Sequence, residues 1–379
     1  MAFVHLHNHS EYSMLDGATR VKDMVSRAVE LGMPAVALTD HGYMYGIPEL
    51  GLACDAVNNA APDFRQWKHD KEAFANGEFG EAPENERARA QWEHDRAVWD
   101  VTGSLDTARP KPVIKPIFGC EVYFTPDDTL ARDRKPELYH MILLARNHTG
   151  YVNLMQIVSE AAVSGFYYKP RVTLDNLRRH REGIIATSAC LSGAIMRNLD
   201  QGNPAEALRW ATTFRDLFEP GNFYIEIQEH GITTERGNTE EEINRQLIQI
   251  AAEVGCKVIA ANDFHYLTRD DAPVQDIMMC IGTNSKVDDP NRIRMTGSEF
   301  YMKTEEEMRT LFPYCPEACD NTLEIAEKCD VQLEWGQIIL PRYPLLDPGE
   351  THESQFRREC EAGLAKRYGD DWADQVIGG

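Results

Sequence analysis

Two short segments near the start of the chain are dense in side chains that can bind metal ions. The first reads His5-Leu6-His7-Asn8-His9, and the second ends in Asp40-His41. In an extended strand alternate side chains face the same side, so we expect His5, His7 and His9 to project together. An isolated histidine is usually a hydrogen-bonded core residue, but that interpretation does not explain a cluster. The spacing therefore predicts metal chemistry.

More ligand-capable side chains lie in or next to apolar runs further along the chain. They are Glu121 within 116–124, His140 at the start of 139–145, Cys190 at the end of 183–190, and Asp263 and His265 at the end of 257–265. The runs are short, rich in β-branched residues and separated by helix-like segments. This alternation is typical of buried parallel strands.

The alternation also predicts a fold. Candidate strands lie near 2–7, 35–40, 115–123, 140–146, 183–189, 223–228 and 257–263, and helix-like segments include 20–31, 204–218 and 239–254. Seven such units favour an α/β fold, a distorted (β/α)7 TIM-like barrel, with an open doubly wound sheet as the alternative. The active site of such a barrel lies at the carboxyl ends of its strands. We therefore expect the ligand-capable side chains to converge on one mouth.

Several longer motifs carry a resemblance to a known family. They are HLHNHSEYSMLDGA at 5–18, LTDHG at 38–42, GFYYKPR at 165–171 and TSACLSG at 187–193. Together they resemble the polymerase and histidinol phosphatase (PHP) family, in the branch found at the amino-terminal end of bacterial replicative DNA polymerases. Residues 302–308, 321–327 and 339–344 extend the resemblance, which covers the chain except for about 57–112.

The resemblance implies a set of metal ligands. Carried over residue by residue, it comprises His7, His9, Asp16, His41, Glu121, His140, Cys190, Asp263 and His265. It also implies three neighbouring sites: His7 and His9 with Glu121 and Asp263; Glu121 as a bridge to His140 and Cys190; and Asp16 with His41 and His265. Imidazole with thiolate suits zinc, and carboxylates accept manganese or iron. We therefore expect three divalent metal ions, zinc or manganese first and iron as a further option.

The complete ligand set favours retained hydrolysis of phosphate esters. The expected activity is that of a 3′→5′ proofreading exonuclease acting on a DNA 3′ end, single-stranded or frayed, with His9 and Asp263 as catalytic residues. Tyr167, Lys169 and Arg171, together with Phe166 and Tyr168, are candidate contacts to the unstacked strand. Equally well, the aromatic rings fill core and the two cations lie on the surface. We expect His230 to bind substrate or to support a ligand, and His5 to support a ligand.

The resemblance also implies a domain organisation. Residues 1–285 are expected to form the PHP barrel, interrupted by a charged insertion at 57–112 that contains a helix near 84–100. Residues 286–379 are expected to begin the polymerase core, with helices at 305–311 and 318–329 and a loop at 339–350. The closely spaced aspartates of a polymerase palm are not found in the sequence, so we expect the polymerization site to be absent and nucleotide addition not to occur.

Composition limits the location and the partners. The net charge of −22 predicts weak DNA binding by this chain alone. We therefore expect the rest of the polymerase chain and other replisome subunits to provide most of the contacts to DNA. No signal peptide or membrane span is evident, and nine unpatterned cysteines are typical of a reducing compartment, which predicts a cytoplasmic protein without a membrane partner. Two alternative functions stay open: a phosphoesterase acting on a small phosphomonoester, and a non-catalytic metal-stabilised scaffold for the polymerase.

Overall fold

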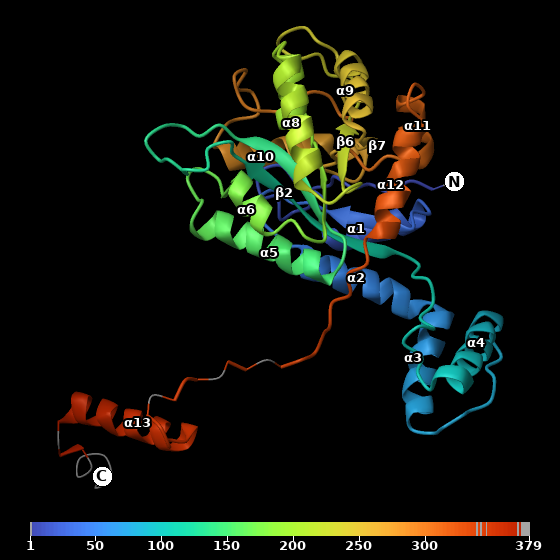
Figure 1. Cartoon of the computed structure of the whole chain (residues 1–379), viewed down its shortest axis with the longest axis vertical. Coiled ribbons are helices and arrows are strands. Elements are labelled where there is room, and N and C mark those ends of the chain that lie inside the picture. The colour runs from blue at the N-terminus through green and yellow to red at the C-terminus, as the bar shows by residue number, and fades with distance from the viewer. Residues whose placement is uncertain (1, 339, 342, 346, 370, 373–379) are drawn as a thin grey trace. The chain divides into compact units, whose positions relative to one another are not determined.

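The computed structural model describes residues 2–338, 340–341, 343–345, 347–369 and 371–372. The chain forms two compact units, Met1–Gln332 and Leu333–Gly379. The first contains the sheet and all the predicted ligands (Figure 1). Within the described residues, no helix has the length and apolar character needed to cross a bilayer.

A curled, mixed sheet is the centre of the first unit. Its described strands are β1 (Ala35–Leu38), β2 (Lys115–Phe124), β3 (Tyr139–Ala145), β4 (Arg171–Val172), β5 (Ile184–Thr187), β6 (Phe223–Ile227) and β7 (Lys257–Ala260). They lie in the order β1-β2-β3-β5-β6-β7, and β4 pairs with β2. The strand β3 is antiparallel to both β2 and β5, whereas the other pairs are parallel.

The extended residues 5–9 connect the two edges of this sheet. On one side the amides of Ala37 and Thr39 donate to the carbonyls of His5 and Asn8. On the other side the amide of His9 donates to the carbonyl of Phe264, just after β7, at 2.9 Å. The predicted strand at 2–7 is therefore not a regular strand, but this segment curls the sheet into the distorted TIM-like barrel that the sequence predicts.

The chain is rich in helices, several of which pack against the sheet. Those of the first unit are α1 (Val21–Glu30), α2 (Ile47–Ala60), α3 (Pro62–Ala75), α4 (Glu86–Thr102), α5 (His148–Val163), α6 (Leu174–Arg179), α7 (Ala194–Asp200), α8 (Pro204–Leu217), α9 (Glu240–Val254), η1 (Arg269–Asp271), α10 (Ala272–Thr283), α11 (Glu305–Leu311) and α12 (Glu317–Lys328). Figure 1 shows α8 and α9 side by side next to β6. In the second unit α13 (His352–Tyr368) follows the segment at 339–350, which lies partly outside the described residues.

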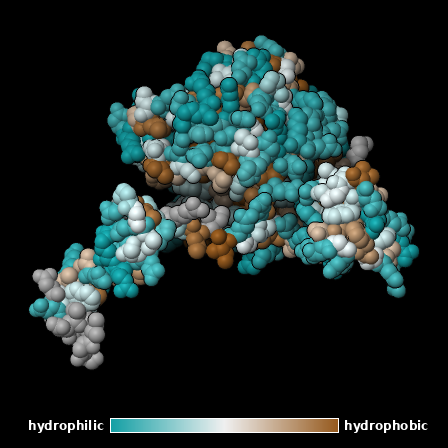
Figure 2. All heavy atoms as spheres, turned by 60° about the horizontal axis from the view of Figure 1, so that its bottom comes forward, coloured by the Kyte–Doolittle hydropathy of each residue, from teal (hydrophilic) through white to brown (hydrophobic). Residues whose placement is uncertain are grey.

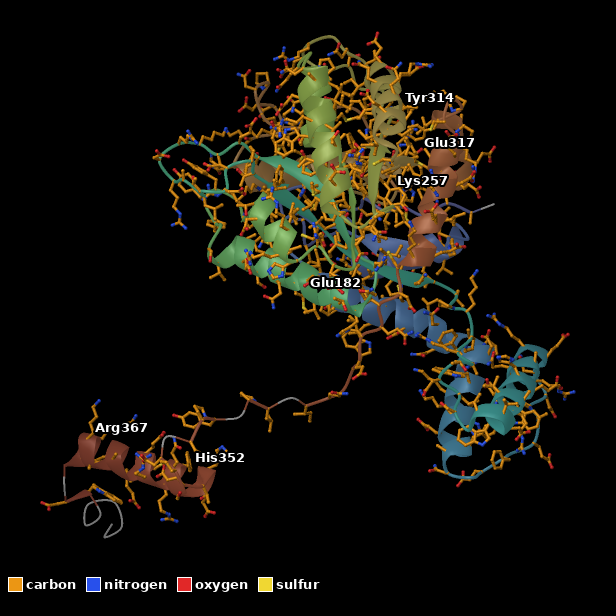
Figure 3. The ribbon with its side chains drawn as sticks, viewed as in Figure 1. Glu182, Lys257, Tyr314, Glu317, His352 and Arg367 are labelled. Atoms are coloured by element: carbon orange, nitrogen blue, oxygen red, sulfur yellow. The ribbon has the colours of Figure 1, made fainter. Side chains whose placement is uncertain are left out.

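The barrel core joins distant parts of the sequence. Leu6, Ile117 and Ile259 pack there with Ile325 and Cys329 from α12 and its C-cap. At the same end, Lys257 lies beside α12 (Figure 3) and pairs with Glu324, which also accepts a hydrogen bond from Tyr224. Residues 286–332, which the sequence assigns to the polymerase core, thus belong to the same compact unit as the barrel. Their assignment to the polymerase core stays a prediction.

The insertion at 57–112 forms a helical hairpin with a core of its own. After α2, the helices α3 and α4 pack around Phe64, Trp67 and Phe74, with Trp92 and Trp99 half-buried against them. Asn58 connects the hairpin to the barrel by donating to the carbonyl of Ile114 at 2.9 Å. Elsewhere hydrophilic residues cover most of the face in Figure 2, in keeping with the high net charge.

Candidate metal centre

The topology explains why ligands from opposite ends of strands meet. His41, Cys190 and Asp263 follow the parallel strands β1, β5 and β7, so they lie at the carboxyl ends. His140 stands at the beginning of β3, but β3 is antiparallel and pairs Tyr123 of β2 with His140. The start of β3 therefore lies at the same end of the barrel as the carboxyl ends of its neighbours.

Glu121 is the fully buried centre of the cluster. One carboxylate oxygen, Oε1, lies 2.6 Å from Nδ1 of His140 and 3.5 Å from Nε2 of His7. The other, Oε2, lies 3.4 Å from Nε2 of His9 and contacts Nδ1 of His41. The thiol of Cys190 lies 3.9 Å from Oε1. A carboxylate with both oxygens engaged in this way can bridge neighbouring cations, which an imidazole cannot.

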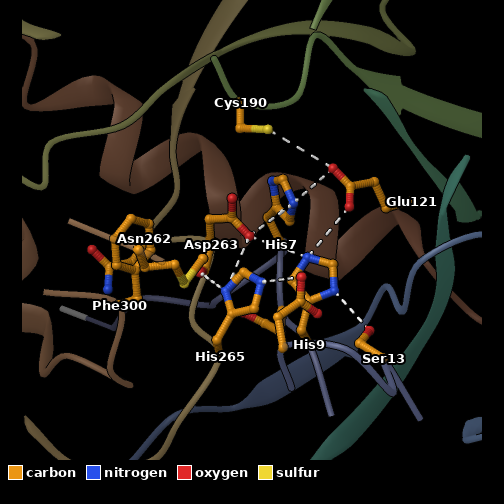
Figure 4. A network of polar contacts seen from close by, with 12 residues as sticks. His7, His9, Ser13, Glu121, Cys190, Asn262, Asp263, His265 and Phe300 are labelled. Carbon is orange, nitrogen blue, oxygen red and sulfur yellow. Dashed lines mark hydrogen bonds and ion pairs between the residues drawn. The ribbon is translucent and has the colours of Figure 1, made fainter. Parts of the chain in front are cut away.

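Asp263 completes the first predicted group. Its Oδ1 lies 3.2 Å from Nε2 of His7 and 3.1 Å from Nε2 of His9 (Figure 4). The backbone of Asp263 is left-handed, with φ of 45°, a conformation that aspartate tolerates better than most residues. The structure thus brings His7, His9, Glu121 and Asp263 together as predicted.

The residues of the other two predicted sites also lie close together, but the boundary between the sites differs from the prediction. His140 lies 3.6 Å from the Cys190 thiol, and Asp16 lies 3.2 Å from Nε2 of His41 and 4.0 Å from Nε2 of His265. However, the ring of His9 stacks 4.3 Å from that of His265, so His9 also joins His41 and His265 in a set able to hold one ion. The nine ligands therefore form one continuous cluster rather than three separate groups.

Two effects set the pKa values in the cluster: burial, which disfavours the charged form of each group, and the charges of neighbouring groups. Burial alone would raise the pKa of Glu121, but His140 and His41 lower it well below its usual range. Burial would lower the pKa of His7, but Asp263 and Glu226 raise it well above its usual range. For His9, burial and the imidazoles of His41 and His265 lower the pKa to about 3, so this ring is neutral and can donate a lone pair.

Hydrogen bonds at Nδ1, which the sequence does not predict, orient three of the histidines. Nδ1 of His7 donates to Glu226 at 2.7 Å, and Nδ1 of His265 donates to the carbonyl of Asp263 at 2.7 Å. Nδ1 of His9 donates to the hydroxyl of Ser13 at 2.9 Å, and that hydroxyl donates to Asp40. A proton held on Nδ1 leaves the Nε2 lone pair free to face the centre.

The donor atoms that face the centre fit bound cations. Buried atoms without a hydrogen-bond partner include Nε2 of His7 and His9, Oε2 of Glu121, and Oδ1 of Asp263. Polar atoms buried in this way are costly unless something binds them. Burial and the Glu121 carboxylate raise the pKa of the Cys190 thiol well above its usual value, so a thiolate here needs an adjacent cation. The mixed N, O and S donors suit zinc, manganese or iron.

The predicted strand-binding residues lie in different environments. Phe166 and Tyr168 are exposed, and Lys169 donates to the hydroxyl of Tyr123 at 3.2 Å, beside the ring that stacks on His41. The prediction that Tyr167 and Lys169 contact substrate stays open. Arg171, in contrast, is 2% exposed and donates to the carbonyls of Gly165, Leu130 and Ala131, so its geometry favours a structural role.

The contacts of His230 and His5, the two remaining histidines with a predicted role, also favour a structural role. Both ring nitrogens of His230 are engaged, one with Glu240 and the other with the carbonyl of Asn262, and its ring stacks on Phe300 at 4.1 Å. His5 bonds the carbonyl of Lys303 at 2.8 Å, and burial lowers its pKa to about 4. It does not project into the cluster with His7 and His9, because its ring packs between Phe3 and Phe264.

Comparison with known proteins identifies the class of protein that this fold and cluster define. The PHP domain profile matches residues 5–230, and the chain therefore belongs to the PHP family. It is similar to the DNA polymerase III subunit alpha of Treponema pallidum, with 35% identity over 371 residues, and to that of Borreliella burgdorferi, with 37% identity over 371 residues. Each alignment covers 97% of this chain and 27% of the relative, so the chain spans about a quarter of these proteins.

The similarity to a solved structure is weaker. An amidohydrolase from Chromobacterium violaceum aligns with a TM-score of 0.33 and 14% identity, covering 70% of this chain and 88% of that one. The description of the fold therefore rests on the hydrogen-bonded sheet of the chain itself.

Proposed function

We propose that this chain is the PHP portion of a DNA polymerase III alpha subunit, and that its cluster hydrolyses the terminal phosphodiester at a DNA 3′ end. The observation that carries the proposal is the convergence of all nine predicted ligands on one mouth, with buried donor atoms that lack hydrogen-bond partners. Two or more divalent ions bound there would lower the pKa of a water and neutralise phosphoryl oxygens.

The chain's own residues provide the other requirements of hydrolysis. Glu121 and Asp263 place negative charge between the imidazoles, so that adjacent cations are tolerated. His41, His140 and Asp16, which are half-buried, form the side of the cluster nearest to solvent. Lys169 places a positive charge beside Tyr123, next to these two histidines, where a substrate phosphate would be attracted.

A direct test uses a 5′-labelled primer with an unpaired 3′ end, incubated with zinc, manganese or iron in turn. We expect the protein to shorten the primer one nucleotide at a time. Asp263→Asn and His9→Ala should lower the rate at least about 100-fold, because each removes a donor from the group around Glu121. His94→Ala, an exposed histidine on α4, is the matched control and should retain the rate. No trimming by the wild type with any of the metals would overturn the exonuclease proposal.

A second candidate function is a metal-stabilised scaffold. The observation that favours it is the connection between the ligand loop and the segment before α11: the amide of His265 donates to the carbonyl of Phe300 at 2.9 Å, and Asn262 donates to the carbonyl of Tyr301 at 2.7 Å. Metal bound to Asp263 and His265 would fix the ligand loop, and through these hydrogen bonds it would also fix the segment before α11. Metal-dependent stability without any trimming would support the scaffold. DNA, the remaining polymerase chain and replisome subunits stay proposed partners under either function.

A further inference from the structure

The turn that follows the ligand His41 carries two stacked tyrosine rings. The ring centroids of Tyr43 and Tyr45 are 5.0 Å apart, and their planes are 7° from parallel. Tyr43 is half-buried, whereas the side chain of Tyr45 is 67% exposed. One face of Tyr45 therefore rests on Tyr43, and most of the remaining ring surface is in contact with solvent.

Close packing at both ends of the turn holds the two rings in place. Gly42 has a left-handed backbone, with φ of 69°, and a Cβ there would lie 2.9 Å from Cγ of Pro170 and 3.1 Å from the ring of Tyr123. A Cβ on Gly46 would lie 2.7 Å from Leu38 and 2.9 Å from the ring of Tyr12. The turn thus fits tightly between two loops at the mouth, and little conformational freedom is lost when a ligand stacks on it.

The ring of Tyr123 lies next to this turn, to a cation and to two of the predicted ligands. The ammonium of Lys169 is 4.9 Å from the centre of the Tyr123 ring, which also packs against Gly42. The same ring lies 6.1 Å from the ring of His41 and 5.3 Å from that of His140. The Tyr123 ring therefore connects the turn with a positive charge that would attract a phosphate and with two of the predicted ligands.

We propose that Tyr43 and Tyr45 form a platform on which the terminal nucleobase stacks, which makes a nucleotide-bearing phosphodiester the substrate class of the metal centre. Every base presents an aromatic face, so a platform of this kind selects nucleotides without selecting sequence. A small phosphomonoester without an aromatic group would gain nothing from it. This inference rests on the proposed hydrolysis at a DNA end, but the platform can be tested separately because stacking needs no metal.

The test measures binding to two oligothymidylates that differ only at the 3′ end. Both carry a 5′ fluorescein; one ends in thymidine and the other in an abasic sugar with the same phosphate. Fluorescence anisotropy on the metal-free protein records binding without turnover. We expect the wild type to bind the base-bearing strand about tenfold more tightly. Tyr45→Leu should remove this preference, and Tyr45→Phe should keep it because the ring remains.

Controls separate the platform from general effects. Leu52→Ala, an exposed apolar residue on α2, should keep the tenfold preference. Tyr45→Ser provides a second ring deletion if Tyr45→Leu lowers the melting temperature. An equal affinity of the wild type for the two strands, or a preference that survives both ring deletions, would overturn the proposal.

Parallel trimming assays distinguish this inference from the proposed function. Trimming by a wild type that shows no base preference would leave the hydrolytic function standing and overturn the platform. A ring-dependent preference in a protein that trims no DNA would support the platform and overturn the exonuclease.

Discussion

For His7, His9 and His265, the partner of the Nδ1 atom decides that Nε2 faces the proposed metal centre. Glu226 is the strongest of these partners, because it is buried on β6, accepts from His7, and is itself held by Gln228 at 2.7 Å and by the hydroxyl of Thr187. A carboxylate fixed by two donors cannot rotate away from the imidazole. It therefore fixes both the tautomer and the orientation of His7.

Removing this partner should weaken metal binding without removing a ligand. We expect Glu226→Leu to lower zinc affinity about 10- to 100-fold, and Glu226→Gln to lower it less because the amide oxygen can still accept from His7. Competition with a chromogenic chelator measures the affinity. Glu235→Gln, an exposed carboxylate, is the control. Equal affinities for the Leu variant and the wild type would show that His7 is oriented by packing alone.

Residue identity in the sequence indicates the candidate ligands but not their hydrogen-bond partners. His7, His9 and Asp263 stand in motifs of unusual composition, whereas Glu226 lies in an ordinary apolar strand and Ser13 in a polar loop. Nothing in their spacing indicates a hydrogen bond to a histidine. Arg171 illustrates the opposite case: its motif predicts a binding cation, but its guanidinium satisfies buried carbonyls instead. Only the folded chain shows which donors are already used.

Among the elements, the α3–α4 hairpin carries a pair of buried carboxyl groups far in sequence from the metal ligands. Asp70 and Asp95 are 1% and 0% exposed, and each accepts a hydrogen bond at Oδ1 from a glutamine on its own helix, Gln66 and Gln91. Each Oδ2 is buried without a hydrogen-bond partner. Burial, and then the neighbouring Asp70, raise the pKa of Asp95 to about 7.

The hairpin should therefore lose stability as pH rises. Asp95 holds its proton in the folded state up to a pH of about 7, but in the unfolded chain only up to its ordinary value of 3.8. Its contribution is thus fully present below that value and falls as pH rises from there through about 7. Asp95→Asn should remove this loss and stabilise the hairpin at pH 8 by about 1–2 kcal/mol, less than the full pKa change because the buried amide also needs hydrogen-bond partners.

Tryptophan fluorescence provides the measurement, since Trp67, Trp92 and Trp99 belong to the hairpin core. Urea unfolding is followed at pH 5 and pH 8, with Asp100→Asn as the exposed control on the same helix. A wild-type midpoint that rises between these pH values would contradict the assignment.

The sequence also predicts where most strands lie along the chain better than it predicts whether neighbouring strands run parallel or antiparallel. The runs at 115–123, 140–146 and 223–228 correspond to β2, β3 and β6 within a residue or two. The antiparallel direction of β3 was not predicted, because strand pairing depends on contacts between residues distant in sequence. The short strand β4 also escaped prediction, since its two residues show no periodicity.

At the scale of the whole molecule, metal should stabilise the first unit. The ligands come from residues 7 to 265, and α12 adds Ile325 to the same barrel core, so ions at the mouth hold together segments that unfolding would separate. At metal concentrations about 100 times the dissociation constant, binding contributes about 2.7 kcal/mol. Chelation should therefore lower the melting temperature of this unit, Met1–Gln332, by about 4 °C for each ion lost, and added zinc or manganese should restore it.

Differential scanning fluorimetry with and without chelator measures this change, and elemental analysis of the same samples confirms metal loss. The variant Cys190→Ser should show a smaller shift, because a hydroxyl is a poorer zinc ligand than a thiolate. A melting temperature that stays constant after confirmed metal loss would contradict the prediction.

The closure of the barrel by residues 5–9 has a consequence for the order in which the protein is made. His7 and His9 leave the ribosome first, but their partners Asp263 and His265 follow about 250 residues later, which at bacterial rates of elongation is a delay of about 13–50 s. During that interval the nascent chain holds exposed imidazoles with no complete site to enter. If the full cluster binds metal as proposed, that binding becomes possible only after translation has passed β7, and a ribosome stalled earlier would carry a chain that cannot assemble the complete site.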